Sequence, residues 1–388
     1  MRIGILTQSI NYNYGGILQN YALQTVLRRM GHEVETLNWD AYRCEHAHEN
    51  YFFQLFQVTK IFFSKYILRR KRNFIWEQRR FFYMLSNSNS DFCHKYIVSS
   101  NWLWGKKAFR KYTIDKQFDA LIVGSDQTWR PAYNKNGMLY RMFLDFTEGV
   151  DIKRIAYSAS FGVNQWEFNE TQTMKCSKLL NIFDSVSVRE DSGIVLCANH
   201  FGINNVVCTL DPTMLLPKQD YINISNQYDK VSSKEELLVY MLDFTPDKER
   251  IVSIISKRKK LNQSMFIVRY CNLGMVDEQE IKDYIIPPVD NWLGAFNNAK
   301  YVICDSFHGM VFSIIFNKPF IVLSNRKRGM ERFVSLLNKL HLQNRLVEEF
   351  SEEVFNVLDT PIDWSQVNEK LNKLRLFSFE FLRLSLEE

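Results

Sequence analysis

Residues 301–323 read YVICDSFHGMVFSIIFNKPFIVL, and the rest of the chain is organised around this stretch. The apolar run 301–304 predicts a buried strand, residues 310–316 predict a buried helix, and residues 320–323 predict a second buried strand. An Asn-Lys-Pro sequence separates the helix from the second strand, as is typical of a helix end. The stretch therefore predicts a strand–helix–strand unit of an α/β sheet.

The turn between the first strand and the helix is polar and contains Ser306, His308 and Gly309. Open α/β sheets bind their ligands at the carboxyl ends of the strands. The start of a helix also offers unpaired backbone N–H groups and the positive end of the helix dipole, which suit an anion. We therefore expect this turn to bind an anionic ligand beside one imidazole.

The chain has 388 residues, which exceeds the usual size of a single hydrophobic core and predicts two domains. Hydrophobic residues make up 46% and charged residues 24%, which is ordinary for a soluble globular protein. The net charge of +6 permits an anionic ligand without requiring nucleic acid.

Seven cysteines are scattered without CxxC pairs, and Cys197, Cys208 and Cys304 lie in apolar runs. This pattern favours a reducing compartment and argues against a zinc site. Residues 1–7 predict a short strand rather than a signal peptide, and no apolar stretch is long enough to span a bilayer. We therefore predict a cytoplasmic protein, which can also lie at the inner face of the membrane.

Polar residues also follow the first predicted strand. It leads into a Gly-rich turn that contains Asn13, Gly15 and Gly16, and a helix is predicted from residue 17. The two glycines let the backbone approach a ligand closely. The turn is not a GxGxxG fingerprint and no P-loop lysine follows it. A tight strand-to-helix turn without a ligand explains the same residues equally well.

The buried strand FDALIV delivers Ser125, Asp126 and Gln127 to the carboxyl edge of the sheet. Capping and turn-making are their alternative roles, although the tryptophan beside them favours ligand contact. Arg189 follows a short strand at a helix start. It can bind an anion there, or it can form a salt bridge with a neighbouring carboxylate.

A second alternation of strands and helices begins after a linker that starts at Pro212. We predict a Rossmann-like domain at residues 1–212 and another at residues 213–388, whose last helices can pack back on the first domain. The predicted fold is α/β, with two doubly wound sheets facing across a cleft. Arg269 and Arg326 follow predicted strands of the second domain.

Residues 42–113 are rich in Phe, Tyr, Lys and Arg and predict a helical insertion in the first domain. Between residues 51 and 80, basic side chains interleave with aromatic ones. Such a helix can rest on a membrane surface, bind an acceptor or contact nucleic acid. The interpretation that we favour is an amphipathic helix that packs its aromatic side chains on the domain and leaves its charges in water.

Together, the residues at the predicted strand ends hold one histidine and several arginines but few carboxylates. Arginine binds carboxylate or phosphate oxygens in pairs, and histidine is a natural general acid or base near neutral pH. No pair of carboxylates predicts a glycosidase, and no nucleophile elbow is present. We therefore predict a small, highly charged anionic substrate, handled without a metal or another cofactor.

The sequence resembles that of a known family, the polysaccharide pyruvyl transferases. Five stretches carry the resemblance, in order along both predicted domains: NYGGILQNYALQ (13–24), VGSDQTW (123–129), SVREDSG (187–193), LDPTMLL (210–216) and DSFHGMVFSIIFNKPF (305–320). The insertion at 42–113 is not covered by these motifs.

The resemblance implies an architecture similar to that of GT-B glycosyltransferases. It also implies transfer of a pyruvyl group from phosphoenolpyruvate to sugar hydroxyls of a polysaccharide precursor, often as a ketal, on an acceptor that can be lipid-linked. It implies that His308 is the catalytic histidine and that Arg189 binds the phosphate or carboxylate of the donor. We expect Arg269 or Arg326 to assist.

Two other functions fit the same residues. A nucleotide-sugar-dependent glycosyltransferase of GT-B architecture could use Asp126 or Glu190 as its base. A non-catalytic protein that binds an anionic ligand would keep the fold and release no phosphate. Nucleic-acid binding is the least favoured function, because the basic residues cluster in one insertion and no nucleic-acid motif is present.

Overall fold

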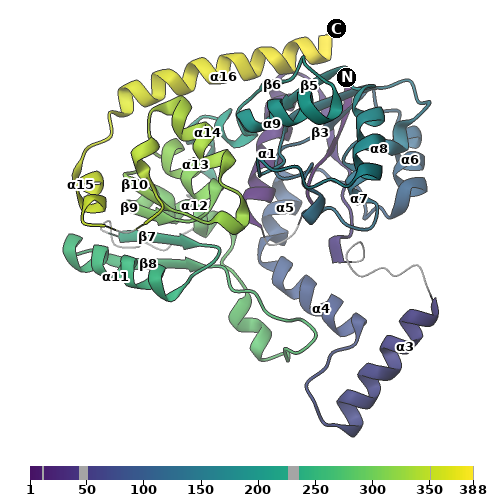
Figure 1. Cartoon of the computed structure of the whole chain (residues 1–388), viewed down its shortest axis with the longest axis horizontal. Coiled ribbons are helices and arrows are strands. Elements are labelled where there is room, and N and C mark those ends of the chain that lie inside the picture. The colour runs from purple at the N-terminus through teal and green to yellow at the C-terminus, as the bar shows by residue number, and fades with distance from the viewer. Residues whose placement is uncertain (11–12, 43–50, 226–235, 350, 388) are drawn as a thin grey trace.

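The computed structural model describes residues 1–10, 13–42, 51–225, 236–349 and 351–387. These residues form two β-sheets with helices packed around them (Figure 1). The strands of the first sheet lie in the order β2-β1-β3-β4-β5-β6, and those of the second in the order β11-β10-β9-β7-β8. All pairings between these strands are parallel.

The strands of the first sheet are β1 (Arg2–Leu6), β2 (Glu33–Thr36), β3 (Ala120–Val123), β4 (Lys153–Ala159), β5 (Ser185–Val188) and β6 (Val207–Cys208). The strands of the second sheet are β7 (Glu236–Met241), β8 (Asn262–Ile267), β9 (Ala299–Cys304), β10 (Phe320–Leu323) and β11 (Leu346–Val347).

The helices of the first half are α1 (Tyr14–Arg29), α3 (Tyr51–Phe62), α4 (Ile75–Ser86), α5 (Ser90–Tyr96), α6 (Gly105–Lys116), α7 (Met138–Arg141), α8 (Glu170–Leu180) and α9 (Asp191–Leu196). Those of the second half are α10 (Lys218–Ser225), α11 (Pro246–Lys259), α12 (Val289–Asn298), α13 (Phe307–Ile315), α14 (Glu331–Leu340), α15 (Glu353–Asp359) and α16 (Trp364–Glu387).

Both faces of each sheet carry buried apolar side chains. In β1, Ile3 and Ile5 belong to the core that contains α1, whereas Leu6 belongs to a separate core on the other face. In β9, Val302 and Ile303 alternate between two cores in the same way. Strands buried on both faces are typical of parallel sheets with helices on each side. The predicted fold class, two Rossmann-like α/β units, is confirmed.

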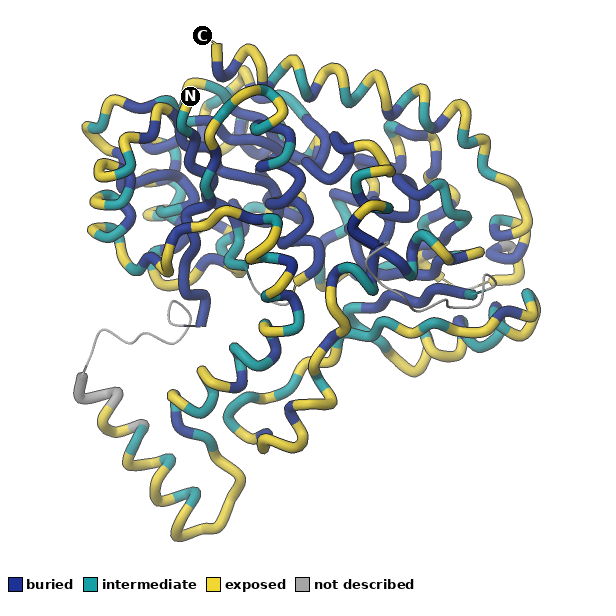
Figure 2. The backbone as a smooth tube through the Cα atoms, turned by 180° about the vertical axis from the view of Figure 1, so that it is seen from behind, coloured by how far each residue is buried: buried dark blue, intermediate teal, exposed yellow. Residues whose placement is uncertain are grey.

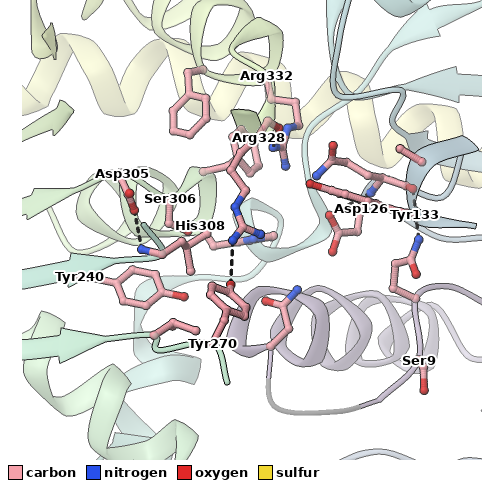
Figure 3. A pocket seen from close by; sticks show the side chains of 18 of the residues that line it. Ser9, Asp126, Tyr133, Tyr240, Tyr270, Asp305, Ser306, His308, Arg328 and Arg332 are labelled. Atoms are coloured by element: carbon pink, nitrogen blue, oxygen red, sulfur yellow. Dashed lines mark hydrogen bonds between the residues drawn. The ribbon is translucent and has the colours of Figure 1, made fainter. Parts of the chain in front are cut away.

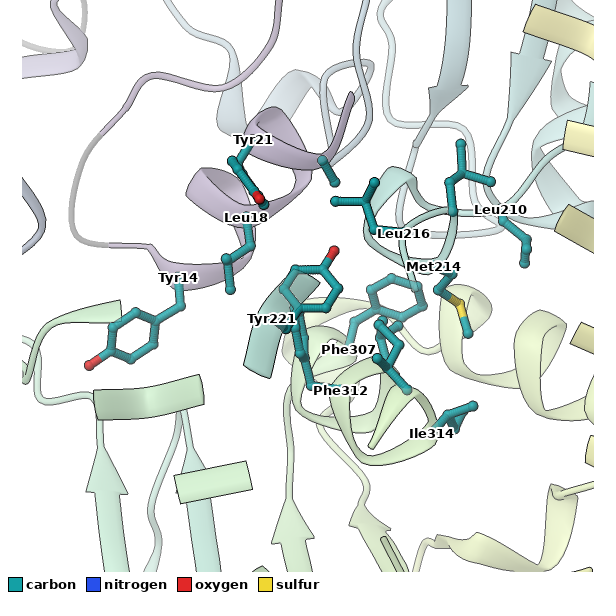
Figure 4. Close-up of a cluster of buried hydrophobic side chains, with 14 of the residues drawn as sticks. Tyr14, Leu18, Tyr21, Leu210, Met214, Leu216, Tyr221, Phe307, Phe312 and Ile314 are labelled. Carbon is teal, nitrogen blue, oxygen red and sulfur yellow. The ribbon is translucent and has the colours of Figure 1, made fainter. Parts of the chain in front are cut away.

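One apolar core joins the two sheets (Figure 4). It contains Tyr14 and Leu18 of α1, Met214 of the segment that follows β6, and Phe307 and Phe312 of α13. The two units are thus held together by hydrophobic packing rather than by a flexible linker alone.

The strand order of each sheet reverses once, between β1 and β3 in the first sheet and between β7 and β9 in the second. Ligands of open α/β sheets bind at such reversal points, outside the carboxyl ends of the strands. The fold therefore offers two candidate ligand sites, one on each sheet.

The helices at these reversal points begin earlier than the sequence predicts. α1 begins directly after Asn13, whose side chain accepts a hydrogen bond from the backbone N–H of Gly15. α13 begins directly after Ser306, whose side chain accepts from the backbone N–H of Gly309. His308 therefore lies in the first turn of a helix rather than in a loop, because the capping residue sets the helix start.

The insertion is only partly packed on the body of the protein. Helix α4 packs on the loop after β8, where Phe81 and Leu85 form a small apolar cluster with Val276 and Ile281. Helix α6 contributes Phe109 to the core of the first sheet. The favoured interpretation, in which aromatic side chains pack on the domain, is correct for these helices.

Helix α3 differs, because it projects from the body (Figures 1 and 2). A π-helical turn, Phe63–Ile67, continues it. Phe62, Phe63 and Tyr66 are exposed. The favoured interpretation is therefore wrong for α3, since the described aromatic side chains of this helix and its π-helical turn do not pack on the domain.

The C-terminal helix α16 returns to the first sheet (Figure 1). Ser378 Oγ accepts a hydrogen bond from the backbone N–H of Leu210 at 3.0 Å, and Lys153 Nζ donates to the carbonyl of Leu386 at 3.0 Å. The end of the chain thus contacts the first unit.

Candidate active site

A pocket of about 360 Å³ lies between the carboxyl ends of the two sheets (Figure 3). The first sheet contributes the loops after β1 and β3, and the second contributes the loops after β7, β8 and β9 and the start of α14. Both reversal points therefore open into the same pocket. Its polar lining includes Asp126, Tyr240, Tyr270, His308, Arg328 and Arg332.

His308 lies in the wall of this pocket and is held from two sides. Its Nε2 lies 3.5 Å from Oδ2 of Asp211 without forming a hydrogen bond. On the other side the ring meets the first turn of α1, where a Cβ atom on Gly15 would lie 1.9 Å from His308 Nδ1. Only glycine permits so close an approach. The position of the imidazole thus depends on residues of the first half of the chain.

Arg189 is buried behind the pocket, with a side chain that is 1% exposed. Its Nη1 donates to Asp211 Oδ2 at 2.7 Å and to Ser125 Oγ at 3.2 Å, and its Nη2 donates to Asp126 Oδ1 at 3.3 Å. The structure therefore has the salt bridge that was the alternative role for Arg189. The carboxylate of Asp211 connects Arg189 to His308.

The buried carboxylates of this network remain ionised. Burial alone raises the pKa of a carboxyl group, but His308 and Arg189 outweigh burial and hold the pKa of Asp211 below its ordinary value. For Asp126, burial is likewise outweighed, here by Arg189 and then His308, and the pKa is lowered. Asp126 also adopts a backbone φ of 80°, which is rare outside glycine. Backbone strain of this kind clusters at functional sites.

Arg332 is a buried cation without a carboxylate partner. It is 5% exposed, its Nη2 donates to the backbone carbonyl of Arg328 at 2.9 Å, and its Nε has no hydrogen-bond partner. Burial, followed by the positive charge of Arg189, lowers the pKa of Arg332 to about 10, so the side chain stays charged at neutral pH. Within the described part of the chain, no carboxylate forms an ion pair with it. An uncompensated buried charge is costly, so this side chain points to an anionic ligand.

Arg328 lies beside Arg332 and is fixed in place. Its Nε donates to Asp243 Oδ2 at 2.9 Å and its Nη2 donates to the hydroxyl of Tyr270 at 2.8 Å (Figure 3). Although burial acts against the charge, the hydrogen bond to Asp243 keeps the pKa of Arg328 above its ordinary value. Two permanent guanidinium groups therefore face one side of the pocket.

Several sequence-predicted site residues meet here. Those that line the pocket are Asn13, Asp126, Gln127, Ser306 and His308. They come from three segments that are far apart in the sequence.

Other predicted residues support the pocket without lining it. Ser125 is bonded to the Arg189 network, and Gly15 packs on His308. A Cβ atom on Gly16 would meet only the side chain of Asn13, at 3.5 Å, whereas one on Gly309 would lie 2.8 Å from the Cβ of Cys304. Gly309 therefore permits the packing of α13 on β9.

Arg269 and Arg326 lie outside this pocket. β8 ends at Ile267, and Arg269 follows it with its side chain exposed at a neighbouring cavity. The side chain of Arg326 is 80% exposed and pairs with Glu348 at 2.6 Å. Arg328 and Arg332, rather than Arg269 and Arg326, present guanidinium groups to the pocket.

Sequence reasoning missed the roles of Asp211 and Arg332. Asp211 directly follows the largely apolar run VVCTL at 206–210, and this placement could have drawn attention to it. Arg332 lies inside helix α14, and arginine is a residue type that is mostly exposed. Only the packing of α14 against the pocket shows that this arginine is buried.

A comparison with models of known protein families identifies the family of the chain. The sequence model described as "Polysaccharide pyruvyl transferase" matches residues 13–327. The chain belongs to the polysaccharide pyruvyl transferase family. The predicted family is thereby confirmed, and it assigns the chain to the transferases of polysaccharide biosynthesis. No curated protein matches the chain.

Solved structures resemble the chain only distantly. A UDP-N-acetylglucosamine 2-epimerase from Rickettsia bellii is 13% identical, with a TM-score of 0.49 over 99% of this chain and 95% of that one. The Neisseria meningitidis UDP-GlcNAc 2-epimerase bound to UDP-GlcNAc is 9% identical, with a TM-score of 0.47 over 97% and 94%. A ugt transferase from Siraitia grosvenorii in complex with UDP is 10% identical, with a TM-score of 0.44 over 99% and 95%. These similarities carry no information about the activity of this family member.

Replacing Gly15 by alanine should displace the imidazole of His308, because the new Cβ atom would lie 1.9 Å from its Nδ1. A displacement of about 1 Å at a reacting group costs on the order of 10²-fold in rate, so we expect a loss of that size in transferase turnover. Gly16→Ala is the matched control, since its Cβ atom would make ordinary contacts. Equal turnover of the two variants would contradict the positioning role of Gly15.

Asp211→Asn should destabilise the protein, because it removes a carboxylate from a buried Arg189 pair. Breaking a buried pair costs about 3–5 kcal/mol in unfolding free energy, which urea denaturation at neutral pH would measure. The pKa of Asp211 is lowered in the folded state, so its contribution is complete above the ordinary carboxyl pKa and declines as the pH falls below it.

The stability difference between the native protein and Asp211→Asn should therefore shrink below about pH 4. Asp115→Asn is the control, since it breaks the exposed pair with Lys111 and should change stability little. A difference that stays constant from neutral to acidic pH would mean that Asp211 does not act through its charge.

Proposed function

We propose that this protein transfers a pyruvyl group from phosphoenolpyruvate to hydroxyls of a sugar in a polysaccharide or glycolipid precursor and forms a pyruvate ketal. The observation that carries the proposal is Arg332, a buried guanidinium that faces the pocket without a carboxylate partner among the described residues. Phosphoenolpyruvate carries a phosphate and a carboxylate, and guanidinium groups bind both in pairs of hydrogen bonds.

The reaction begins when a proton reaches the methylene carbon of phosphoenolpyruvate, which leaves positive charge on the adjacent carbon. A sugar hydroxyl adds to that carbon, the bond between carbon and the phosphate oxygen breaks, and a second hydroxyl of the same sugar adds in turn. One phosphoenolpyruvate and one diol thus give one ketal and one inorganic phosphate. Of the two hydroxyl protons lost, the balance places one in the new methyl group and one on phosphate.

Residues at the pocket supply each role in this reaction. Arg332 and Arg328 bind the phosphate or carboxylate of the donor, together with the backbone N–H groups at the start of α13. His308 delivers the proton to the methylene carbon. Asp211, ionised and 3.5 Å from His308 Nε2, orients the imidazole and stabilises its charge while it holds the proton.

Arg189 then acts as a positioning residue. Both of its Nη atoms are bonded to carboxylates of the first unit, so it holds Asp211 and Asp126 in place behind the pocket. The remaining wall, with the rings of Tyr240 and Tyr270, offers apolar faces and hydroxyls of the kind that contact a sugar acceptor.

The proposal is tested by incubating the protein with phosphoenolpyruvate and a panel of free and lipid-linked saccharides. We expect phosphate release that depends on the saccharide, and a product whose proton NMR spectrum shows a new methyl group. An enolpyruvyl ether has the same mass but shows vinylidene protons instead. In deuterated water, one deuterium should enter each methyl group.

Other outcomes would overturn the proposal. Turnover of a nucleotide sugar with no phosphate release from phosphoenolpyruvate would identify a glycosyltransferase. A rise in thermal stability with phosphoenolpyruvate, without release of phosphate in any member of the panel, would identify a binding protein.

A further inference from the structure

The part of the insertion that projects from the body is largely exposed (Figure 2). We name residues 55–72 the basic arm; they comprise the end of α3, the π-helical turn and the segment that leads to α4. Its exposed large apolar side chains are Leu55, Phe56, Phe62, Phe63, Tyr66, Ile67 and Leu68. Patches of contiguous exposed apolar side chains are uncommon on soluble proteins and mark interaction sites.

The net charge of the whole chain is concentrated in the same segment. Residues 51–72 hold six of the 49 lysines and arginines and none of the 43 acidic residues. The rest of the chain therefore carries 43 basic and 43 acidic residues and has no net charge. The apolar surface thus lies in a segment whose charged residues are all basic.

Most of these charges remain available to a partner. Lys60, Arg69, Arg70 and Arg72 are exposed, and among the described residues none of them forms an ion pair. Four guanidinium and ammonium groups therefore border the apolar face of the arm.

The other two basic residues join the arm to α4 and to the loop after β8. Lys65 Nζ pairs with Glu77 at 2.8 Å, and Lys71 Nζ pairs with Asp277 at 3.0 Å and with Glu280 at 2.7 Å. Asp277 and Glu280 belong to the loop after β8, and Tyr270 of the same loop lines the pocket. The arm is therefore attached to a wall of the pocket.

We propose that the basic arm binds the surface of an anionic lipid membrane. A helix with an aromatic, apolar face bordered by lysine and arginine lies in the interface of such a membrane, with its apolar side chains among the acyl chains and its charges near the head groups. Trp76, exposed at the start of α4, is a residue type enriched at this depth.

The contact is peripheral. No helix that the structure describes has both the length and the apolar character to cross a membrane. On α16 the exposed Leu376 and Phe377 lie between Lys373, which pairs with Glu369, and Arg383, which pairs with Glu380. In the arm, by contrast, four basic residues form no ion pair among the described residues. Charge complementarity to anionic lipids therefore singles out the arm, and the inference does not depend on the transfer reaction.

The test uses the full chain and sedimentation with two kinds of vesicle, phosphatidylcholine alone and phosphatidylcholine mixed with phosphatidylglycerol. We expect binding to the anionic vesicles that weakens as salt is added, and little binding to the neutral ones. One variant, Phe62→Ser with Phe63→Ser and Ile67→Ser, removes apolar contact. A second variant, Arg69→Gln with Arg70→Gln and Arg72→Gln, removes charge.

Each variant should lower the affinity for anionic vesicles by at least about tenfold. The charge variant should do so because each basic residue near the membrane surface contributes a several-fold factor. The apolar variant should do so because it removes the side chains that bury apolar area in the membrane. A matched control, Lys107→Gln with Lys218→Gln and Lys257→Gln, removes the same number of exposed charges outside the arm and should bind as the native protein does. All the substituted side chains are exposed, so the thermal unfolding midpoint should not change, and its measurement verifies the fold.

Three results would overturn the proposal. The first is an absence of binding to anionic vesicles by the native protein. The second is equal loss of binding in the arm variants and the control. The third is a charge-dependent shift of an RNA or DNA duplex, or an oligomer that the arm variants dissociate, with no vesicle binding; either would assign the arm to another partner.

Discussion

His308→Ala is expected to abolish phosphate release from phosphoenolpyruvate while the protein stays folded. The imidazole is the titratable group of the pocket that lies between Asp211 and the first turn of α1, where it can hold a proton near a ligand. General acid catalysis contributes about 10²–10⁴ in rate, so kcat should fall by at least that factor. Initial-rate kinetics with phosphate detection would measure the loss.

Two further variants distinguish a loss of catalysis from a loss of folding. His94→Ala removes an exposed histidine and should leave the rate unchanged. His308→Gln keeps most of the volume of the side chain and should be as inactive as His308→Ala, because glutamine cannot deliver a proton. A His308→Ala protein that still placed deuterium in the methyl group at the native rate would remove His308 from the proton transfer.

Arg332→Met is expected to abolish function without loss of stability. The guanidinium group is buried and has no carboxylate partner in the described structure, so removing its charge takes away a cost that the folded protein bears. The unfolding free energy should stay the same or rise, whereas kcat/KM for phosphoenolpyruvate should fall by about 10²–10³-fold. Denaturant unfolding and steady-state kinetics on the same preparation would measure both quantities.

Arg326→Met is the matched control for this prediction. The side chain of Arg326 is exposed and pairs with Glu348 outside the pocket, so its loss should change neither quantity much. Arg332→Lys should recover part of the binding, since lysine keeps the charge but not the paired hydrogen bonds. The opposite pattern, an inactive Arg326→Met beside an active Arg332→Met, would return the donor site to the residues that sequence reasoning chose.

The basic arm shows which structural questions composition leaves open. The sequence between 51 and 80 fits a packed amphipathic helix, a membrane surface, acceptor binding or nucleic-acid contact, because aromatic and basic residues at helical spacing suit all of them. The structure shows that Phe81 of α4 packs on Ile281, whereas Phe62 and Phe63 are exposed. Periodicity defines a face of a helix, but only the neighbouring elements decide what covers it.

Within the pocket, the residues that could be predicted from the sequence are those whose positions depend on residues close by in the chain. Asn13 and Ser306 cap helices, and Asp126 and Gln127 follow a buried strand, so their places at the carboxyl ends of strands follow from turn and capping rules. His308 follows from the same rules, because it lies two residues beyond a cap.

The sequence by itself thus determined the alternation of strands and helices, the two parallel sheets and the polar edge of each. Tertiary structure alone decided which arginine side chains lie at the pocket. Arg189 and Arg326 both follow strands, yet one is buried against two carboxylates and the other lies in water. Arg332 lies within a helix and still reaches the pocket. The physical reason is that the environment of a long charged side chain depends on elements distant in sequence, and no local pattern encodes their approach.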